Sequence, residues 1–572
     1  MSDGRPVVMR AAPDPQVLAA LSTFDPISAR LFAARGVADP AQLDYGLARL
    51  APVSLLENVE AAVDLLMAKR ASRITVVGDF DVDGATSAAL MLRCLREFGF
   101  EDVDYLVPNR FEFGYGLTPE IVRIAAGNSP RLLVTVDNGI SSLAGVEEAN
   151  RLGMPVLVTD HHLPGNELPD AAVIVNPNLP GSRFPSRNLA GVGVAFYVLA
   201  ALGRRLERDG RKGAARVPSR YLDLVALGTV ADVVPLDHNN RVLVDQGLRR
   251  IRAGQTVPGI EALLRQSGRQ PARTVSADLG FVAGPRINAA GRLEDISIGI
   301  ECLLTDDMST ALHHAAILDR INGERRDIES TMRDQAFAYV DEMDARNLPA
   351  CVCVYDEAWH QGVVGLIAAR VRERCHRPTI AFARESDTLL KGSARSIPGV
   401  HVRDLLEAVH AVDPGLIVKF GGHAMAAGLT IAETHYDAFA RRAAEQLERL
   451  YPLADFSGAI VTDGVLPERA LDLDFARKLR DAGPWGAGFP EPVWSGDFEV
   501  VEQRTVGEKH LKLRVRPAAG GNTIDAIAFN QAGPAWRGFV QLAYRLDVNE
   551  YRGFESAQLV VEQIAPVKSR GA

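Results

Sequence analysis

Short motifs rich in aspartate and histidine, each following a short apolar run, constrain the fold of this 572-residue chain most strongly. Asp79-Phe-Asp81-Val-Asp83-Gly84 follows residues 74–78, Asp137 follows residues 132–136, and Asp160-His161-His162 follows residues 156–159. Helical patterns separate several of these runs, and strands that alternate with helices indicate a doubly wound parallel α/β sheet. Groups that follow the strands of such a sheet meet at one edge, where ligands bind.

The residue types in these motifs point to divalent metal ions. Asp81 and Asp83 are two positions apart, so both are expected to face one side of an extended stretch, and Asp232 ends a later helical pattern. Carboxylates held close together repel one another unless cations lie between them. Oxygen ligands with one imidazole suit Mg²⁺ or Mn²⁺ better than zinc. Two such ions lower the pKa of bound water and stabilise the oxygens of a phosphoryl transfer.

Other interpretations of the same residues exist. A single aspartate after a strand, such as Asp137, is often a turn residue or a helix cap. The Asp-x-Asp-x-Asp-Gly pattern also resembles a calcium-binding EF-hand loop, but the glutamate required there is Leu90. The joint pattern favours the metal centre.

The remaining patterns predict several domains, because the chain is too long for one core. A long polar helix is expected at about residues 309–344, a second α/β segment begins at Cys351, and the segment after Leu453 suits an OB-like β-barrel. The expected ranges are an N-terminal helical extension at 1–60, a catalytic domain at 61–235, a helical connector at 236–345, a second α/β domain at 346–452 and the barrel at 453–572.

Composition narrows the class of protein. No apolar run is long enough to span a bilayer and no signal peptide is evident, so we expect a cytoplasmic protein. Five scattered cysteines do not suggest a disulfide framework. The net charge of −9 is unusual for a nucleic-acid binder, but residues 370–403 hold eight Arg or Lys against three acidic residues.

These motifs resemble the DHH/DHHA1 phosphoesterase superfamily, and within it the exonucleases specific for single-stranded DNA. Beyond the acidic and histidine motifs, the resemblance is carried by segments spread over roughly residues 70–490. They are residues 108–116 (PNRFEFGYG), 284–292 (GPRINAAGR), 359–365 (WHQGVVG), 392–396 (GSARS), 421–428 (GGHAMAAG) and 484–488 (PWGAG).

The resemblance implies a parallel-sheet DHH domain, a long connecting helix, a DHHA1 domain and an OB-fold. It implies that two Mn²⁺ or Mg²⁺ ions are bound by Asp81, Asp83, Asp137, His161 and Asp232. Asp79, Asp160 and His162 are expected to serve catalysis beside the ions. The implied activity is 5′→3′ hydrolysis of single-stranded DNA to mononucleotides by a monomer in repair and recombination. A single-strand-binding protein and a helicase are the implied partners, and no membrane is involved.

Further residues are candidates for substrate binding. Ser393 and Arg395 lie in an expected Gly-Ser-x-Arg turn, where a hydroxyl and a guanidinium suit a phosphate. The resemblance places them near a 5′-phosphate pocket with Arg110 and Arg286. Asn288 is expected either to donate to a phosphate oxygen or to cap a helix, and His423 either to approach the scissile phosphate or to be buried in a turn. Candidate stacking platforms for bases are Phe111, Phe113, Tyr115 and Trp485.

Two other functions compete with the exonuclease. One is a DHH phosphodiesterase of short oligonucleotides, whose relatives are much shorter than this chain. The other is an inactive DHH-like replication scaffold, which should have lost metal ligands that this sequence retains.

Overall fold

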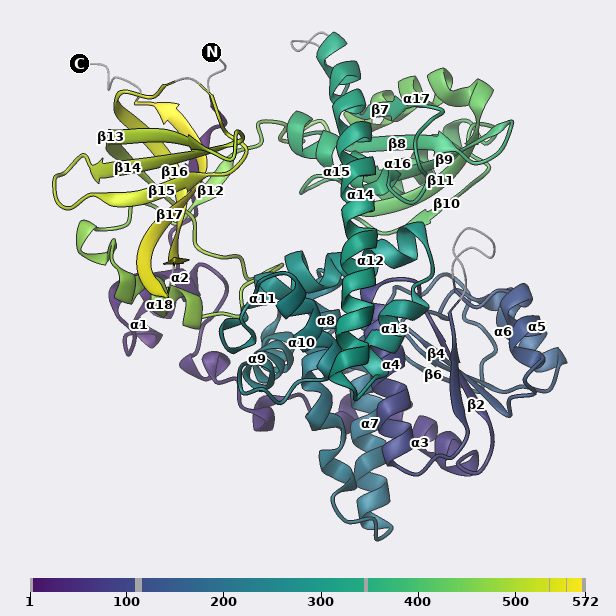
Figure 1. The fold of residues 1–572 in the computed structure, drawn as a ribbon. Helices are drawn as coiled ribbons and strands as arrows, with labels where there is room; N and C mark the ends of the chain where they lie inside the picture. Colours follow the sequence, from purple (N-terminus) through teal and green to yellow (C-terminus); the bar gives the residue numbers. More distant parts are fainter. Residues whose placement is uncertain (1–3, 108–115, 344–347, 534, 552, 568–572) are drawn as a thin grey trace. The chain divides into compact units, whose positions relative to one another are not determined.

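The computed structural model describes residues 4–107, 116–343, 348–533, 535–551 and 553–567 (Figure 1). It divides into two compact units, which are treated separately below. Unit 1 comprises residues 1–319 together with 461–572, and unit 2 comprises residues 320–460. No helix in these ranges is both long and apolar enough to cross a membrane.

Unit 1 contains a parallel sheet with strand order β3-β2-β4-β5-β6, of which Figure 1 labels β2, β4 and β6. Its strands are β2 (Ile74–Gly78), β3 (Val103–Leu106), β4 (Leu132–Val136), β5 (Val156–Thr159) and β6 (Val173–Val175). Every residue of β2, β4 and β5 is buried, which explains their continuous apolar runs. The predicted parallel α/β sheet is confirmed.

Helices cover both faces of this sheet. They are α3 (Val59–Ala68), α4 (Val82–Glu97), α5 (Pro119–Ala126), α6 (Leu143–Arg151), α7 (Gly191–Arg208) and α8 (Leu222–Ala231). Figure 1 shows α5 and α6 on one face, with α4 and α7 on the other. Helix α4 is buried on nearly all sides because the sheet, α7 and α8 pack around it. The helix that follows the first acidic motif is therefore held firmly in place.

A helical segment follows the sheet, and it ends in one long helix. Its elements are α9 (His238–Arg252), α10 (Pro258–Gln266), α11 (Ser276–Asp278), the π-helical turn η7 (Leu279–Ala283), α12 (Gly284–Leu293), α13 (Ser297–Leu304) and α14 (Met308–Glu342). The prediction of a long helix at about 309–344 is confirmed by α14.

Unit 2 is a mixed sheet with order β10-β11-β9-β8-β7 and flanking helices. Its elements are β7 (Val352–Tyr355), α15 (Val364–Cys375), β8 (Thr379–Arg384), β9 (Leu389–Arg395), α16 (Val402–Val412), β10 (Lys419–Gly422), β11 (Ala426–Ala432) and α17 (Tyr436–Leu450). β7 and β8 are parallel, whereas β8–β9, β9–β11 and β10–β11 are antiparallel. Phe382 and Phe439 are fully buried in its core.

Two local predictions in unit 2 are wrong. The Gly-Ser-x-Arg segment is not a turn but the end of β9, a central strand paired with both β8 and β11. The glycine content of residues 419–431 also predicts a loop, but Gly421 and Gly422 belong to β10 of a β-hairpin. In each case the chain pairs with strands distant in sequence, which local turn signals do not reveal.

A closed barrel with order β13-β14-β15-β17-β16 forms the C-terminal part of unit 1 and confirms the predicted OB-like domain. Before and within it lie β12 (Ile460–Thr462), α18 (Leu473–Asp481), β13 (Trp494–Val506), β14 (His510–Pro517), β15 (Ile524–Ala528), β16 (Gly538–Tyr551) and β17 (Phe554–Pro566). Buried residues alternate with less buried ones along β14 and β15, as expected when one face lines the barrel core.

The N-terminal segment docks onto the chain that precedes this barrel. It contains β1 (Val7–Met9), α1 (Pro15–Ala20) and α2 (Pro26–Ala33), and β1 pairs with β12. The guanidinium of Arg35 donates to both carboxylate oxygens of Asp463, at 3.0 and 2.8 Å, and to the carbonyl oxygen of Pro490 at 2.6 Å. Both side chains of the pair are buried.

The remaining elements of the two units are short 3-10 turns at 40–43, 47–49, 53–55, 214–216, 218–221, 271–273, 433–435 and 468–470.

Arg35→Ala is expected to lower the free energy of unfolding by about 3–5 kcal/mol, because the buried Asp463 carboxylate loses its bidentate partner. Thermal unfolding followed by circular dichroism measures the change. The control is Arg49→Ala, which breaks an ion pair with Asp44 whose two side chains are 50% and 51% exposed, and which should cost less than about 1 kcal/mol. Equal melting temperatures for the two variants would contradict this account.

Candidate metal centre

The ends of β2, β4 and β5 bring the sequence motifs to one edge of the sheet. Asp79 follows β2, Asp137 follows β4, and Asp160 follows β5. The chain passes from β2 to β3 on one side and then returns to β4 on the other side of β2. The direction therefore reverses between β2 and β4, and ligand sites in open α/β sheets form at such a switch point. Asp137 has a left-handed backbone with φ of 61°, a conformation uncommon outside glycine.

The first motif folds differently from the prediction. Asp81 is the N-cap of α4, and its side chain accepts a hydrogen bond from the Gly84 backbone N–H at 3.1 Å. Asp83 belongs to the first turn of α4, so the expected extended stretch with both carboxylates on one side is wrong. The helix begins at Val82, directly after the motif's second aspartate, because Asp81 supplies the cap.

The Asp83 carboxylate is also held by a second helix. The backbone N–H groups of Gly191 and Val192, at the N-terminus of α7, donate to its oxygens at 2.6 and 2.9 Å. The positive end of a helix dipole favours an anion there. Gly191 is required because a Cβ atom at this position would lie 2.5 Å from the Cβ of Asp137.

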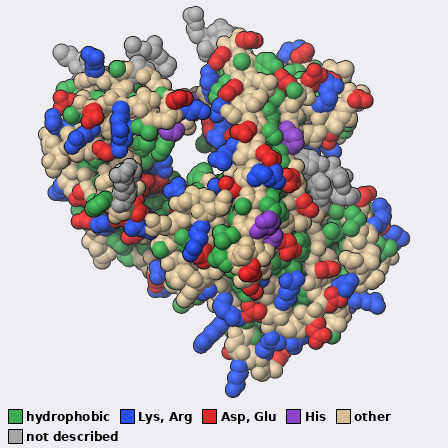
Figure 2. All heavy atoms as spheres, in the orientation of Figure 1, with side chains coloured by type: hydrophobic (Ala, Val, Ile, Leu, Met, Phe, Trp, Pro, Cys, Tyr) green, Lys and Arg blue, Asp and Glu red, His purple; other side chains and the backbone are tan. Residues whose placement is uncertain are grey.

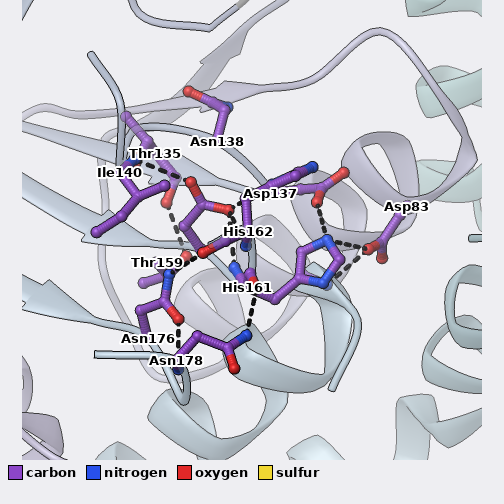
Figure 3. A network of polar contacts seen from close by, with 12 residues as sticks. Asp83, Thr135, Asp137, Asn138, Ile140, Thr159, His161, His162, Asn176 and Asn178 are labelled. Carbon is purple, nitrogen blue, oxygen red and sulfur yellow. Dashed lines mark hydrogen bonds and ion pairs between the residues drawn. The ribbon is translucent and has the colours of Figure 1, made fainter. Parts of the chain in front are cut away.

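His161 lies among three carboxylates, of which those of Asp83 and Asp137 are labelled in Figure 3. Its Nε2 is 3.1 Å from Asp137 Oδ1, 3.6 Å from Asp232 Oδ2 and 4.0 Å from Asp83 Oδ2. Overlapping sets of side chains offer ligand atoms within 4.8 Å of one another. They are Asp79 with Asp81 and Asp137, Asp83 with His161 and Asp232, and Asp137 with His161 and His162. The structure thus brings together all five predicted ligands, and it adds Asp79 and His162 to the clusters.

The electrostatics of this cluster favour a bound cation. Burial and then the charges of Asp83 and Asp81 raise the pKa of Asp137 well above its usual range. The pKa of Asp232 is raised for the same reasons. Asp232 Oδ2 is buried and accepts no hydrogen bond from the described residues. Carboxylate oxygens with an imidazole nitrogen match the ligand preference of Mn²⁺ or Mg²⁺, so the donor set fits these ions.

Asp160 organises the histidine motif instead of facing the other carboxylates. Its oxygens accept hydrogen bonds from the backbone N–H groups of Ile140, His161 and His162 at 2.9, 2.7 and 3.1 Å. Its Oδ1 also lies 2.7 Å from His162 Nδ1. Burial acts to lower the pKa of His162, but this contact with Asp160 outweighs it and raises the pKa to about 9. The catalytic roles expected for Asp79, Asp160 and His162 stay predictions.

Asparagine side chains support the same loop, and sequence reasoning missed them (Figure 3). Asn178 donates to the carbonyl oxygen of His161 at 2.7 Å, and Asn176 donates to that of His162 at 2.9 Å. Asn138 donates to the carbonyls of Val77 and Val136. The Asn-Pro-Asn sequence directly after β6 was an available signal, because polar residues at that edge face the site.

Asn288 and Arg286 lie on α12, beside the first motif. Asn288 Oδ1 accepts a hydrogen bond from the Val82 backbone N–H at 3.1 Å, which corresponds to the predicted alternative of a helix cap. Arg286 donates to the Val282 carbonyl at 2.7 Å and pairs with Asp319 at 2.8 Å. Their contact with a phosphate stays a prediction, and Arg110, Phe111, Phe113 and Tyr115 fall outside the described residues.

Ser393 and Arg395 lie together in unit 2, on β9. Arg395 Nη1 donates to Ser393 Oγ at 3.1 Å. Gly365, in the first turn of α15, allows both side chains to approach that helix N-terminus, since a Cβ there would lie 2.8 Å from Arg395 Nη2 and 2.9 Å from Ser393 Oγ. A guanidinium, a hydroxyl and a helix N-terminus form a suitable phosphate site. His423 lies in the turn between β10 and β11, and its backbone N–H donates to Ala426.

Much of the predicted positive charge in residues 370–403 is neutralised inside unit 2. Arg370 pairs with Glu329 and Glu373, Arg374 pairs with Asp341, and Arg384 pairs with Glu357 and Glu433. On the face drawn in Figure 2, Lys and Arg side chains are interspersed with Asp and Glu. The excess of arginines in the sequence therefore does not by itself define a basic groove.

Among the predicted stacking platforms, Trp485 lies within the part of the chain that the structure describes. Its ring stacks on Phe489 with centroids 5.1 Å apart, and its Nε1 donates to the Leu479 carbonyl at 2.9 Å. The partly buried indole thus serves packing within unit 1.

Comparisons with known proteins agree with this architecture. Family models match residues 73–229 as the DHH family N-terminal domain, residues 347–449 as the DHHA1 domain and residues 462–563 as the RecJ OB domain. The chain is 50% identical to the single-stranded-DNA-specific exonuclease RecJ of Dickeya dadantii over 550 residues, which cover 94% of this chain and 96% of that protein. It is 49% identical to RecJ of Escherichia coli, over 95% of this chain and 96% of that protein.

Solved structures give the same result. A crystal structure of RecJ from Thermus thermophilus in complex with Mn²⁺ matches with a TM-score of 0.81 and 30% identity, over 99% of this chain and 80% of that chain. The corresponding complex with Mg²⁺ matches with a TM-score of 0.75 and 28% identity, over 99% and 79% of the two chains.

Gly191→Ala is expected to weaken Mn²⁺ binding by about 10- to 100-fold, because the added methyl group displaces Asp137 and disturbs the α7 N–H groups that hold Asp83. Isothermal titration calorimetry with Mn²⁺ measures the change. The matched control is Gly323→Ala within α14, where no atom lies within 4 Å of the new methyl group, so binding should match the wild type. Unchanged affinity in Gly191→Ala would show that this close contact does not position the ligands.

Proposed function

The chain belongs to the RecJ family of single-stranded-DNA-specific exonucleases, and on that premise we propose that it removes nucleotides from the 5′ end of single-stranded DNA. It is a metal-dependent exonuclease of the DHH phosphoesterase class. The observation that carries the proposal is the cluster of buried carboxylates around His161 at the edge of the parallel sheet. Repair and recombination are the processes in which such an activity is needed.

Six side chains would hold the metal ions. They are Asp79, Asp81, Asp83, Asp137, His161 and Asp232. When bound, a pair of Mn²⁺ or Mg²⁺ ions supplies a water of lowered pKa and stabilises negative charge on the phosphate oxygens. The protein's part is to fix its ligands, which it does for Asp83 through two N–H groups of α7 and for Asp81 through the start of α4.

Asp160 and His162 would act on the substrate phosphate beside the ions. The contact with Asp160 raises the pKa of His162 to about 9, which favours a protonated imidazole in the metal-free protein. The contact between Nδ1 and Asp160 Oδ1 fixes the orientation of the imidazole ring. Asp160 is therefore a positioning residue, while His162 is the one expected to touch the substrate.

The polarity of digestion would come from a phosphate site in unit 2. Ser393, Arg395 and the N-terminus of α15 form a site suited to a terminal phosphate dianion. A terminal phosphate held at a fixed place presents one particular linkage for cleavage. Arg110, Arg286, Asn288 and His423 are proposed as further contacts to the phosphate backbone on the strength of the family resemblance.

Partners and location complete the proposal. We infer that the chain acts as a monomer in the cytoplasm, together with a single-strand-binding protein and a helicase that supplies unwound DNA. The family resemblance supports these partners, and the need for a single-stranded substrate supplies the reason for them. Copurification from cells tests the partners, and size-exclusion chromatography of the purified protein tests the monomeric state.

Digestion of end-labelled DNA is the direct test of the function. Single and double strands labelled at the 5′ or 3′ end are incubated with Mn²⁺, with Mg²⁺ and with EDTA. The proposal predicts immediate release of a labelled mononucleotide from the 5′ end of the single strand with either ion and none with EDTA. Release from the 3′ end, or activity that survives EDTA, would refute it.

Asp83→Asn should reduce the rate of hydrolysis by at least about 100-fold, because a neutral amide replaces a metal-binding carboxylate of similar shape. Mn²⁺ should also fail to raise the melting temperature of this variant, a readout that does not require activity. Asp209→Asn is the control, since Asp209 lies at the opposite end of α7, is exposed and pairs with Arg205. Wild-type activity in Asp83→Asn would exclude Asp83 as a ligand.

Arg395→Ala should raise the KM for 5′-phosphorylated single strands by about 10- to 100-fold, in line with the loss of a charge-assisted hydrogen bond. The KM for 5′-hydroxyl strands should change little, since they lack the terminal dianion. The matched control is Arg403→Ala, which removes an exposed arginine from α16 of the same unit. Equal losses on both kinds of strand would argue against a terminal phosphate site.

A further inference from the structure

One phenylalanine close to the metal centre is left exposed to solvent. Phe281 is 83% exposed, whereas Leu279 and Ile287 of the same continuous helical segment are buried. It lies in η7, the π-helical turn between α11 and α12. π-Helical turns are rare and frequently occur at functional sites, which makes the exposed ring worth explaining.

The local sequence explains why the turn widens here. Pro285 has no backbone N–H, so it cannot donate to the carbonyl of Phe281 as an α-helix would require. Gly280 and Gly284 flank the turn and let it pack closely on α8, since their Cβ atoms would lie 3.1 Å from Val230 Cγ1 and 3.3 Å from Ala231 Cβ. The wide turn is therefore pressed against the last turn of α8.

Arg286 fixes the turn from the other side. Its Nη1 donates to the Val282 carbonyl at 2.7 Å, and its Nη2 pairs with Asp319 at 2.8 Å. The side chain of Arg286 is only 11% exposed. The exposed ring of Phe281 thus stands on a turn that is held in place by a largely buried ion pair.

The position of the turn relates Phe281 to the metal centre. The last turn of α8, on which the turn packs, leads directly into the metal-binding residue Asp232. The next residue, Val233, is 69% exposed and has a φ of 61°, a strained conformation for a β-branched side chain. Leu163, which follows His162, is 67% exposed. Strongly exposed apolar side chains therefore border the metal ligands on separate segments of the chain.

We propose that Phe281 is a stacking platform for a nucleobase of the DNA strand held at the metal centre, with Val233 and Leu163 as apolar contacts beside it. The inference rests on the proposed function and adds a residue that determines substrate specificity. Single strands offer the flat faces of their bases to an aromatic ring, and stacking tolerates any base sequence. In a duplex the neighbouring base pairs cover those faces, so the ring favours single strands.

The test compares strands with and without bases. The substrates are an intact 5′-phosphorylated single strand and a strand whose first nucleotides are replaced by base-free tetrahydrofuran residues. Phe281→Ala should raise the KM for the intact strand about 10-fold, equivalent to about 1.4 kcal/mol, with a smaller effect on kcat. On the base-free strand, Phe281→Ala and the wild type should have the same KM.

Further variants separate stacking from simple apolar contact. Phe281→Trp should restore the wild-type KM on the intact strand, whereas Phe281→Leu should behave like Phe281→Ala because it lacks an aromatic face. The control Leu453→Ala removes an apolar side chain in unit 2 that is 95% exposed, and it should have no effect on either strand.

The outcomes are distinct. A loss in Phe281→Ala that is equal on the two strands, or no loss on the intact strand, would overturn the stacking proposal. Rescue by leucine as complete as by tryptophan would also overturn it. If the wild type with Mn²⁺ fails to shorten the intact strand at all, the proposed function itself fails, and that result is recognised before any variant is compared.

Discussion

Mutual repulsion among buried carboxylates is the constraint around which unit 1 is organised. Asp83, Asp137 and Asp232 lie together with His161 and are largely shielded from solvent, and the charges of neighbouring carboxylates raise the pKa of Asp137 and Asp232. Such a cluster is costly without cations. The surrounding structure holds these side chains in place despite the repulsion. Helix α4 is buried on nearly all sides, the N-terminus of α7 donates to Asp83, and Gly191 packs closely against Asp137.

The sequence was sufficient for the parts of the molecule that follow simple periodicity. Fully buried strands of a parallel sheet appear as uninterrupted apolar runs, and the residues directly after them lie at the same edge. Hence the parallel sheet, the metal-binding edge, the long helix and the barrel were all predictable. The gathering of acidic and histidine side chains at this edge was predictable too, because metal-dependent chemistry requires particular residue types directly after particular strands.

Most features that differ from the sequence-based predictions depend on contacts between segments that are distant in sequence. Ser393 and Arg395 follow a local turn signal, yet strands from both sides draw them into β9. Asp83 enters a helix because Asp81 caps it, which places the two carboxylates differently from an extended segment. Acids from separate segments neutralise the arginines of α15, and the exposure of Phe281 depends on how η7 packs against α8. Apart from the local cap by Asp81, these contacts join segments that are distant in sequence, so no local pattern reveals them.

The pairing of Arg35 with Asp463 also has a consequence for biosynthesis. The two residues are 428 positions apart, and β1 likewise pairs with the distant strand β12. The amino-terminal helices therefore leave the ribosome long before their docking surface exists. At a translation rate of about 5–20 residues per second, they wait roughly 20–90 s for it. During that interval the nascent chain carries an unpaired strand and an uncompensated arginine, a state in which chaperones have time to bind.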